Sequence, residues 1–221
     1  VKSTGINNVI VTGGVFLNCV ATYKLLDSNY NLHVDPVCND NGISIGNALK
    51  TCYEEDTTPQ RLTNVYLGHR ETDLESKISQ CNFEIIRDIT PKQVAHIICE
   101  GNAVALFQGN SEIGQRALGN RSILFDPRVV DGKNIVNRIK KREDYRPFAA
   151  SVLVEYAKDW FDMKGLDESP YMSYAMDAYQ HTIDTVPAVV HADNTCRIQT
   201  VSRQKNCHFY NVIEEFAIQT K

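Results

Sequence analysis

Short apolar runs, separated by glycine, proline and polar residues, alternate with helical patterns in the first quarter of the chain. The β-branched run NVIVT is typical of a buried strand, and the pair Gly13–Gly14 ends it. Apolar residues then recur at helical spacing before a second short strand and a second helix. This order of elements predicts an α/β layer. The expected strands cover residues 8–12 and 32–34, and the expected helices cover residues 17–26 and 43–53.

A polar stretch at residues 54–64, which contains Pro59, separates this layer from a less regular pattern. The run TDLE from Thr72 matches a capping box, and Thr90–Pro91 supplies an N-cap and a first-turn proline. Because helices and strands now mix without strict alternation, this region predicts an α+β unit. Helices are expected to begin at Thr72, Thr90, Asp131 and Asn206, and strands to cover residues 83–86, 103–107, 151–154 and 195–202.

The change in pattern predicts two units, residues 1–55 and residues 71–221, joined by a linker at residues 56–70. The chain begins with Val1 instead of methionine and stops at Lys221, directly after a helical pattern. Both ends look cut, so we expect a fragment of a longer protein or one half of a split protein.

The composition is ordinary for a soluble globular protein, with 43% hydrophobic and 23% charged residues among 221. A net charge of −4 argues against nucleic-acid binding through bulk charge. No apolar run reaches the length that spans a bilayer, and no secretory signal is visible. The seven cysteines are scattered and form no C-x-x-C pair, which indicates reduced thiols in the cytoplasm and argues against a zinc ribbon.

Two arginine-rich segments change this picture: GQRALGNRSILFDPR at residues 114–128 and NRIKKREDYRPFAASVL at residues 137–153. Guanidinium groups are rigid forks that match phosphate and carboxylate oxygens two at a time. Arg116 is embedded in small and apolar residues, and Gly114 and Gly119 allow backbone N–H groups to approach a ligand closely. The pattern favours a site for a small, strongly anionic ligand over the alternative, a solvated charged face.

Two further motifs lie in the first unit: VTGGVFLN at residues 11–18 and CNDNGISIGNAL at residues 38–49. The glycine pair allows a phosphate or ribose to approach a helix N-terminus, but a tight turn explains it about as well. Asp40 precedes a helix, so it can cap that helix or ligate a metal. The local sequence favours the cap.

Taken together, these two motifs resemble the C-terminal part of the TsaD-like domain, an ATPase domain of the actin/hexokinase type. The resemblance implies that Gly13, Gly14 and Asn18 contact a nucleotide. It also implies that Asp40 completes a divalent-metal site, with iron as the expected metal, together with two histidines of an upstream H-x-x-x-H motif. No two of the six histidines in this sequence have that spacing, which leaves Asp40 without those partners.

A longer series of motifs follows in one order along the chain: YLG (66–68), LFQG (106–109), the two arginine-rich segments, SPYM (169–172), VPAVVHADNTCRIQTVSR (186–203) and FYNVIEEF (209–216). In this order, and over nearly its whole length, the chain resembles the NodU/CmcH-type O-carbamoyltransferases. These enzymes join a TsaD-like domain to a C-terminal YrdC-like domain, which implies that residues 1–55 end the first domain and residues 71–221 form an incomplete second one. One departure is Gln115, where the family commonly has proline before R-A-L-G.

The family resemblance implies a reaction in two steps. The YrdC-like domain converts carbamoyl phosphate and ATP, with Mg²⁺, into carbamoyl-adenylate, and the TsaD-like domain transfers the carbamoyl group to a hydroxyl. The acceptor cannot be read from the sequence. The fragment alone is not expected to complete the transfer, and a separate chain is a candidate source of the missing upstream half. Neither a membrane nor a nucleic-acid partner is expected.

The matched segments assign Arg116, Lys140 and Arg146 to catalysis. Arg197 and Gln199 lie two apart on an expected strand, so their side chains are expected to face one side together. The residues assigned to carbamoyl phosphate or ATP are Arg116, Arg121, Ser122, Lys140, Arg142, Arg146, Arg197 and Gln199.

Structural roles stay open for several of these positions and their neighbours. Arg142 can pair with one of the two acids that follow it, and Arg197 can form a salt bridge with Asp193. His191 can donate to phosphate, although an isolated histidine beside a strand is more often structural. Cys196 is expected to be a packed small residue.

Two other functions stay open at this stage. A YrdC-like module can bind RNA through its basic surface without chemistry, in which case affinity would fall steeply with salt. An inactive remnant is the third reading, because both ends look incomplete. Pyrophosphate exchange into ATP that requires carbamoyl phosphate would separate the enzyme from both alternatives.

Overall fold

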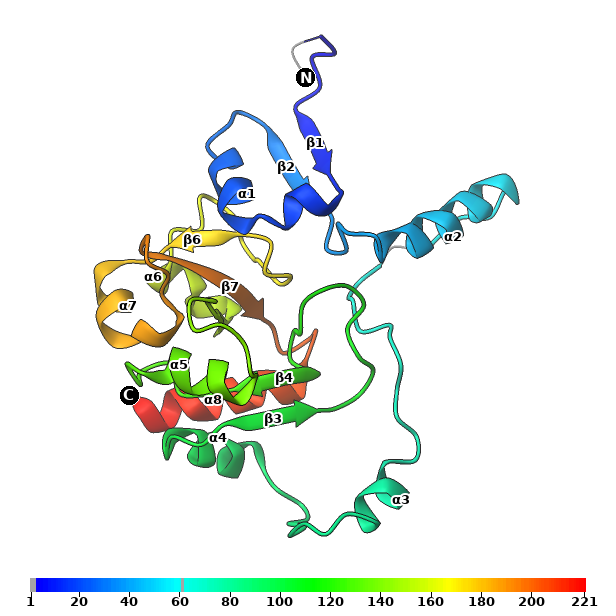
Figure 1. Cartoon of the computed structure of the whole chain (residues 1–221). Coiled ribbons are helices and arrows are strands. Elements are labelled where there is room, and N and C mark those ends of the chain that lie inside the picture. The colour runs from blue at the N-terminus through cyan, green and yellow to red at the C-terminus, as the bar shows by residue number, and fades with distance from the viewer. Residues whose placement is uncertain (1–2, 61) are drawn as a thin grey trace.

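The computed structural model describes residues 3–60 and 62–221. The first layer, blue in Figure 1, consists of β1 (Asn8–Val11), η1 (Gly14–Leu17), α1 (Cys19–Leu25) and β2 (Asn31–Val34). The two strands are parallel, as a strand–helix–strand unit requires, and both confirm the expectation from the sequence. The expected helix is divided at Asn18, whose side chain accepts the Ala21 N–H at 3.2 Å and so begins α1.

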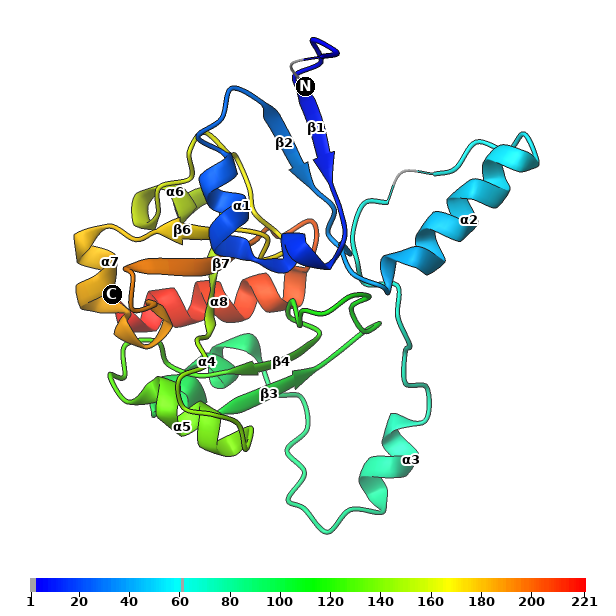
Figure 2. The same cartoon turned by 45° about the horizontal axis from the view of Figure 1, so that its top comes forward.

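Two helices, α2 (Gly42–Glu54) and α3 (Leu74–Ser79), project from the body of the molecule in both Figure 1 and Figure 2. None of the described residues in either helix is buried. The expected helix at residues 43–53 is confirmed, but Asn41 takes the N-cap position of α2 and its side chain makes no capping hydrogen bond. The prediction that Asp40 caps this helix is therefore wrong. The capping box from Thr72 is also wrong, because Asp73 is the N-cap of α3 and no side chain caps it.

The remaining elements form two more sheets and their covering helices. They are α4 (Pro91–Cys99), β3 (Val104–Phe107), β4 (Arg121–Leu124), α5 (Gly132–Ile139), β5 (Ala149–Leu153), η2 (Val154–Tyr156), α6 (Ala157–Trp160), β6 (Ala175–Asp177), α7 (Gln180–Thr185), η3 (Pro187–Val189), β7 (Thr195–Val201) and α8 (Cys207–Thr220). A capping box of Thr90 and Gln93 begins α4, and Asn206 caps α8, both as expected. Asp131 is the N-cap of α5 by position, without a capping hydrogen bond from its side chain.

One expected strand is absent and two strands were not foreseen. Residues 83–86 form no strand, and Phe83 is 78% exposed, because no neighbouring strand pairs with this segment. Strand β4 lies inside the first arginine-rich segment and pairs antiparallel with β3. Strand β6 pairs antiparallel with β7, which lies at the centre of the order β5-β7-β6 and runs parallel to β5.

The largest core joins the first layer to the three-stranded sheet. Tyr23 of α1 and Val34 of β2 pack in one cluster with residues of the last sixty-five positions, among them Phe161 and Met176. The Tyr23 hydroxyl donates to the Asp162 carbonyl at 3.0 Å, and Figures 1 and 2 both show α1 beside β6. The start of the chain is therefore fastened to the sheet that carries Arg197.

The fold is a mixture of a parallel β–α–β layer and sheets with both strand directions. Its assignment to an actin/hexokinase-type remnant and a YrdC-like unit stays a prediction. Across residues 3–60 and 62–221, no helix combines the length and apolar character that a bilayer crossing requires.

Candidate anion-binding site

The loop that presents Arg116 runs from Gln108 to Arg121, and hydrogen bonds between the Glu112 side chain and backbone N–H groups of the same loop fix its shape. The Glu112 carboxylate accepts the N–H groups of Leu118 at 2.6 Å and Asn120 at 2.9 Å. A carboxylate that accepts several backbone N–H groups fills an anion-binding concavity and fixes the loop around it. This role of Glu112 has no signature in the sequence, because its partners are backbone N–H groups.

Gly119 shows why this loop needs glycine. Its φ of +114° is disfavoured for other residues, and a Cβ there would lie 2.3 Å from the ring of Phe209 on α8. Next to it, the Leu118 carbonyl accepts hydrogen bonds at 2.8 Å from both Gln199 of β7 and the Tyr66 hydroxyl. The loop is thus held between α8, β7 and the segment at residue 66.

Arg116 emerges half-buried from this loop, into a pocket beside the first layer. Burial, followed by the nearby positive charge of Arg197, lowers the pKa of Arg116, and no carboxylate is among the groups that shift it. Its Nε is buried and has no hydrogen-bond partner among the described residues. A desolvated guanidinium beside a like charge is costly, and a bound anion would offset that cost.

Arg197 reaches the same region from the central strand β7. It lies in register with Ala149 of β5 and Ala175 of β6, and residues in register on neighbouring strands project to the same face. Two methyl side chains therefore flank Arg197. Its buried Nε also has no partner within the described ranges.

The proposed salt bridge from Arg197 to Asp193 is not formed. The Asp193 carboxylate instead accepts from Thr195, from its N–H at 3.2 Å and its hydroxyl at 2.7 Å. Asp193 and Thr195 thus form a local turn before β7, and Arg197 stays available to a ligand.

The second arginine-rich segment extends the positive field, but its arginines have protein partners. Burial lowers the pKa of Arg142 most, followed by the charges of Arg146 and Arg197. Arg142 donates to the Asn137 side chain and, at 3.3 Å, to the Pro147 carbonyl, and it stacks 4.2 Å from the centre of the Phe148 ring. It does not form the anticipated pair with an acid.

Arg146 is 51% exposed and forms an ion pair of 2.7 Å with Glu143. Its positive charge lowers the pKa of Arg142, so it adds to the positive field around Arg142 and Arg197. Lys140 is exposed at the end of α5, and no interaction links its side chain to Arg116 or Arg197 in the described chain. Its assignment to the site with the arginines stays a prediction.

Three other residues that the sequence assigned to the substrates, Arg121, Ser122 and Gln199, form hydrogen bonds with backbone groups and do not line the pocket of Arg116. Arg121 donates to the carbonyls of Gln108 at 2.6 Å and Gly109 at 3.1 Å, and it stacks over the Phe107 ring at 3.8 Å. The Ser122 hydroxyl accepts the Gly119 N–H at 2.9 Å. Gln199, buried in β7, donates to the loop as described above.

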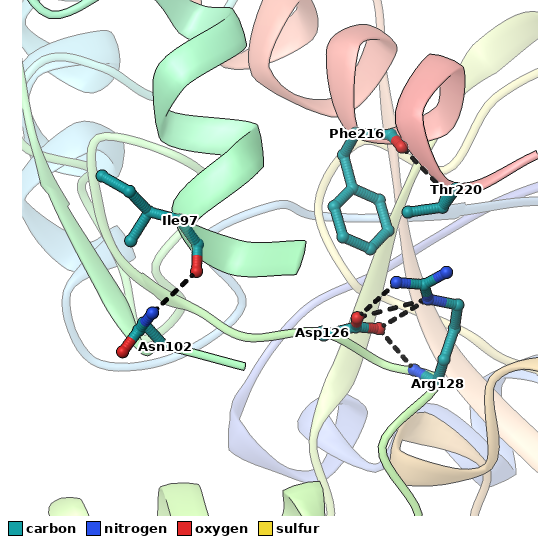
Figure 3. A network of polar contacts seen from close by, with 6 residues as sticks. All are labelled: Ile97, Asn102, Asp126, Arg128, Phe216 and Thr220. Carbon is teal, nitrogen blue, oxygen red and sulfur yellow. Dashed lines mark hydrogen bonds and ion pairs between the residues drawn. The ribbon is translucent and has the colours of Figure 1, made fainter. Parts of the chain in front are cut away.

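Arg128, at the end of the first arginine-rich segment, is also satisfied by protein groups. Figure 3 shows its guanidinium against the Asp126 carboxylate, at 2.7 Å from Nη2 to Oδ2, with Phe216 of α8 nearby. The same view shows two local bonds, from Asn102 to the Ile97 carbonyl and from Thr220 to the Phe216 carbonyl. This corner of the molecule is structural.

His191 is a neighbour of the cluster with both ring nitrogens engaged. Nδ1 lies 3.1 Å from the Thr195 hydroxyl, and Nε2 lies 3.2 Å from the Phe148 carbonyl. Burial is the main cause that lowers the pKa of His191, and the charge of Arg197 also lowers it. These contacts support the structural role over donation to phosphate. Cys196 is fully buried, as expected for a packed small residue.

The glycine pair and Asp40 lie in the first layer. Gly13 has a φ of +94° and starts η1, and Gly14 follows it, so this turn requires glycine at position 13. Asn18 uses its side chain as the cap of α1. Asp40 is exposed, and within residues 3–60 and 62–221 no three His, Cys, Asp or Glu residues are grouped as a metal would require. The described residues by themselves therefore form no metal site around Asp40, and the site that the resemblance implies, with two upstream histidines, stays a prediction.

The pocket itself is formed between the first layer and the loop of Arg116. Phe16 and Leu17 of η1 line it together with Gln115, Arg116 and Tyr171. Sequence spacing could not reveal this meeting, because η1 and the loop are about one hundred residues apart. The arrangement offers a small pocket lined by Arg116, with Arg197 near it, and the Nε of each arginine has no partner in the described part of the chain. It suits a small anion with further polar atoms.

Comparison with known proteins adds a family. A family model described as the carbamoyltransferase C-terminus matches residues 95–221. The nodulation protein NolO of Bradyrhizobium diazoefficiens is 36% identical over an alignment of 231 positions, which covers 99% of this chain and 42% of that protein. Nodulation protein U of Rhizobium fredii is 31% identical, with 96% of this chain and 36% of that protein covered.

A third relative carries an explicit activity in its name. The 3'-hydroxymethylcephem-O-carbamoyltransferase of Amycolatopsis lactamdurans is 31% identical, with 95% of this chain and 39% of that protein covered. The chain thus spans about two-fifths of the length of the curated relatives that it matches.

Proposed function

The chain belongs to the carbamoyltransferase family, and we propose that its arginine cluster binds carbamoyl phosphate and ATP for the synthesis of carbamoyl-adenylate. The observation that carries the proposal is the pair Arg116 and Arg197. Both guanidinium groups are partly buried, both have an Nε without a partner among the described residues, and the charge of Arg197 lowers the pKa of Arg116. Two neighbouring, desolvated cations that form no ion pair within residues 3–60 and 62–221 favour an anionic ligand.

The proposed reaction consumes carbamoyl phosphate, ATP as its Mg²⁺ complex, and one water, and it forms carbamoyl-adenylate, phosphate and pyrophosphate. Water first cleaves carbamoyl phosphate into carbamate and phosphate. A carbamate oxygen then attacks the α-phosphorus of ATP, and the bond from the α-phosphorus to the bridging oxygen breaks, so that pyrophosphate leaves. The arginines hold two polyanions together and stabilise the charge that develops at phosphorus. Transfer of the carbamoyl group to a hydroxyl would release AMP, and the acceptor hydroxyl stays unassigned.

The roles within the cluster differ in this proposal. Arg116 and Arg197 contact the substrates, while Arg142 and Arg146 extend the field that attracts them. Glu112, Gln199 and Arg121 position the loop without contacting the ligand. Nucleotide binding at Gly13 and Gly14, and an iron site that includes Asp40, stay predictions from the resemblance, and no step of the proposal depends on them.

The test is exchange of labelled pyrophosphate into ATP by the protein at its natural length, with and without carbamoyl phosphate. Exchange should require carbamoyl phosphate, and Arg116→Gln or Arg197→Gln should reduce it at least about a hundredfold. Arg138→Gln is the matched control, because Arg138 is 68% exposed and pairs with Asp131 outside the cluster. Unchanged exchange in Arg116→Gln would refute the site. Salt-sensitive RNA binding without any exchange would favour the nucleic-acid module instead.

A further inference from the structure

Gln115, next to Arg116 in the chain, has a buried acceptor without a hydrogen-bond partner among the described residues, whereas Arg116 has a buried donor without one. Gln115 Oε1, a hydrogen-bond acceptor, and Arg116 Nε, a donor, are both buried without a partner among the described residues. Buried polar atoms are almost always hydrogen-bonded, and an unmet one costs free energy. Two consecutive residues with complementary orphan atoms therefore point to one ligand that meets both.

The surroundings leave few other groups to satisfy these atoms. Gln115 and Arg116 line the same pocket, whose other walls include the apolar side chains Phe16, Leu17 and Met172. The Asp35 carboxylate also lines it, and one of its oxygens accepts the Val37 N–H at 2.7 Å. The pocket is thus mostly apolar and contains a small number of convergent polar groups, as sites for small molecules do.

The chemistry of the two atoms restricts the ligand. The oxygens of a fully ionised phosphoryl group only accept hydrogen bonds, so they can satisfy Arg116 but not the acceptor on Gln115. A ligand that satisfies both must present a donor and an acceptor side by side. A carbamoyl group does so, because its NH₂ donates and its carbonyl oxygen accepts in one plane.

We infer that Gln115 accepts from the NH₂ of the carbamoyl group while Arg116 Nε donates to its carbonyl oxygen, so that this pair selects carbamoyl phosphate over other acyl phosphates. The inference rests on the proposed function and specifies which end of the substrate lies in the pocket. The phosphate end then lies toward the terminal guanidinium nitrogens of the two arginines. Gln115 is a specificity residue in this arrangement, and the neighbouring arginine serves both ends of the substrate.

The experiment compares the binding of carbamoyl phosphate, acetyl phosphate and inorganic phosphate by calorimetry, with the protein at its natural length. Acetyl phosphate keeps the carbonyl and the phosphate but replaces NH₂ by methyl. The wild type should bind carbamoyl phosphate about tenfold more tightly than acetyl phosphate, because acetyl phosphate cannot form the hydrogen bond from NH₂ to Gln115. Gln115→Met, which keeps the length of the side chain, should bring that ratio close to one without weakening inorganic phosphate.

Two further variants make the result specific. Gln115→Glu keeps an acceptor oxygen, so it should retain the preference for carbamoyl phosphate although its negative charge weakens all three ligands. Gln204→Met makes the same chemical change at an exposed position and should leave every affinity unchanged. Circular dichroism checks that each variant is folded.

The outcomes separate this inference from the function on which it rests. A wild-type ratio in folded Gln115→Met, or loss of the ratio in Gln115→Glu, would overturn the role of Gln115. If Arg116→Gln binds all three phosphates as tightly as the wild type, the anion site itself is wrong. Loss of phosphate binding in Arg116→Gln, with a wild-type ratio in Gln115→Met, would leave the proposed function intact and remove only the recognition of the carbamoyl group.

Discussion

Arg116 and Arg128 belong to one arginine-rich segment, yet the structure gives them opposite surroundings. The hydrogen bond to Asp126 is the main cause that raises the pKa of Arg128, whereas burial and Arg197 lower the pKa of Arg116. Figure 3 shows Arg128 paired with Asp126, shortly after β4. Arg116 lies in the loop before β4, and its Nε has no partner among the described residues. A cation that pairs with a buried carboxylate is part of the folded structure, while a desolvated cation without a carboxylate is a candidate ligand site.

The loop region depends on its backbone geometry, and Gly119→Ala should break it. The added methyl meets Phe209 at 2.3 Å and must also adopt a φ of +114°. We expect a loss of about 3 kcal/mol in the free energy of unfolding, measured with urea. Gly165→Ala is the matched control, because its φ is +82° and nothing lies within 4 Å of the new Cβ. Equal losses in both variants would mean that contact with Phe209 contributes nothing.

The contrast between the two arginines predicts opposite effects on stability. Arg128→Gln leaves the 4%-exposed Asp126 carboxylate without its cation, which should cost about 2 kcal/mol. The cost is set below that of a fully buried pair, because the Arg128 side chain is 37% exposed. Arg116→Gln removes repulsion from Arg197, so its stability should stay within about 0.5 kcal/mol or rise. Urea unfolding of both variants checks this, and a larger loss in Arg116→Gln would contradict an unpaired cation.

His191 gives the smallest expected effect and reports the charge of Arg197. Its pKa in the folded protein lies below the unfolded value of 6.5, so the unfolded chain binds more protons in the interval between them. Stability from this group is therefore full above pH 6.5 and decreases as the pH falls toward the lowered pKa. At pH 5.5 the loss is at most about 1.4 kcal/mol.

The measurement for His191 is urea unfolding at pH 7.5 and pH 5.5. His191→Gln should lose this part of the pH dependence. Arg197→Gln should retain it at reduced size, because burial remains the main cause of the shift. The same pH dependence in wild type and His191→Gln would assign the effect to other groups.

Most elements with a complete local signature could be predicted from the sequence. Their signature consists of residues that are neighbours in the chain, and the structure contains them. They are the strands expected at residues 8–12, 32–34, 103–107 and 195–202 and the helices expected to begin at Thr90 and Asn206. The errors concern interactions that local pattern does not define. Residues 83–86 are of strand-forming types, but no neighbouring strand pairs with them. Strand β4 begins with arginine and serine, which do not indicate a strand, and it forms because it pairs with β3.

The candidate site divides along the same line. Residue type and spacing were enough to identify two cationic segments and an anionic ligand, because charge and chain periodicity are properties of neighbouring residues. They could not decide which cations are paired. In the tertiary structure Arg128 pairs with Asp126, Arg121 donates to backbone carbonyls, and Lys140 is exposed. Only folding brings Arg197 and η1 to Arg116 across long stretches of chain, since desolvation and pairing depend on which groups meet in space.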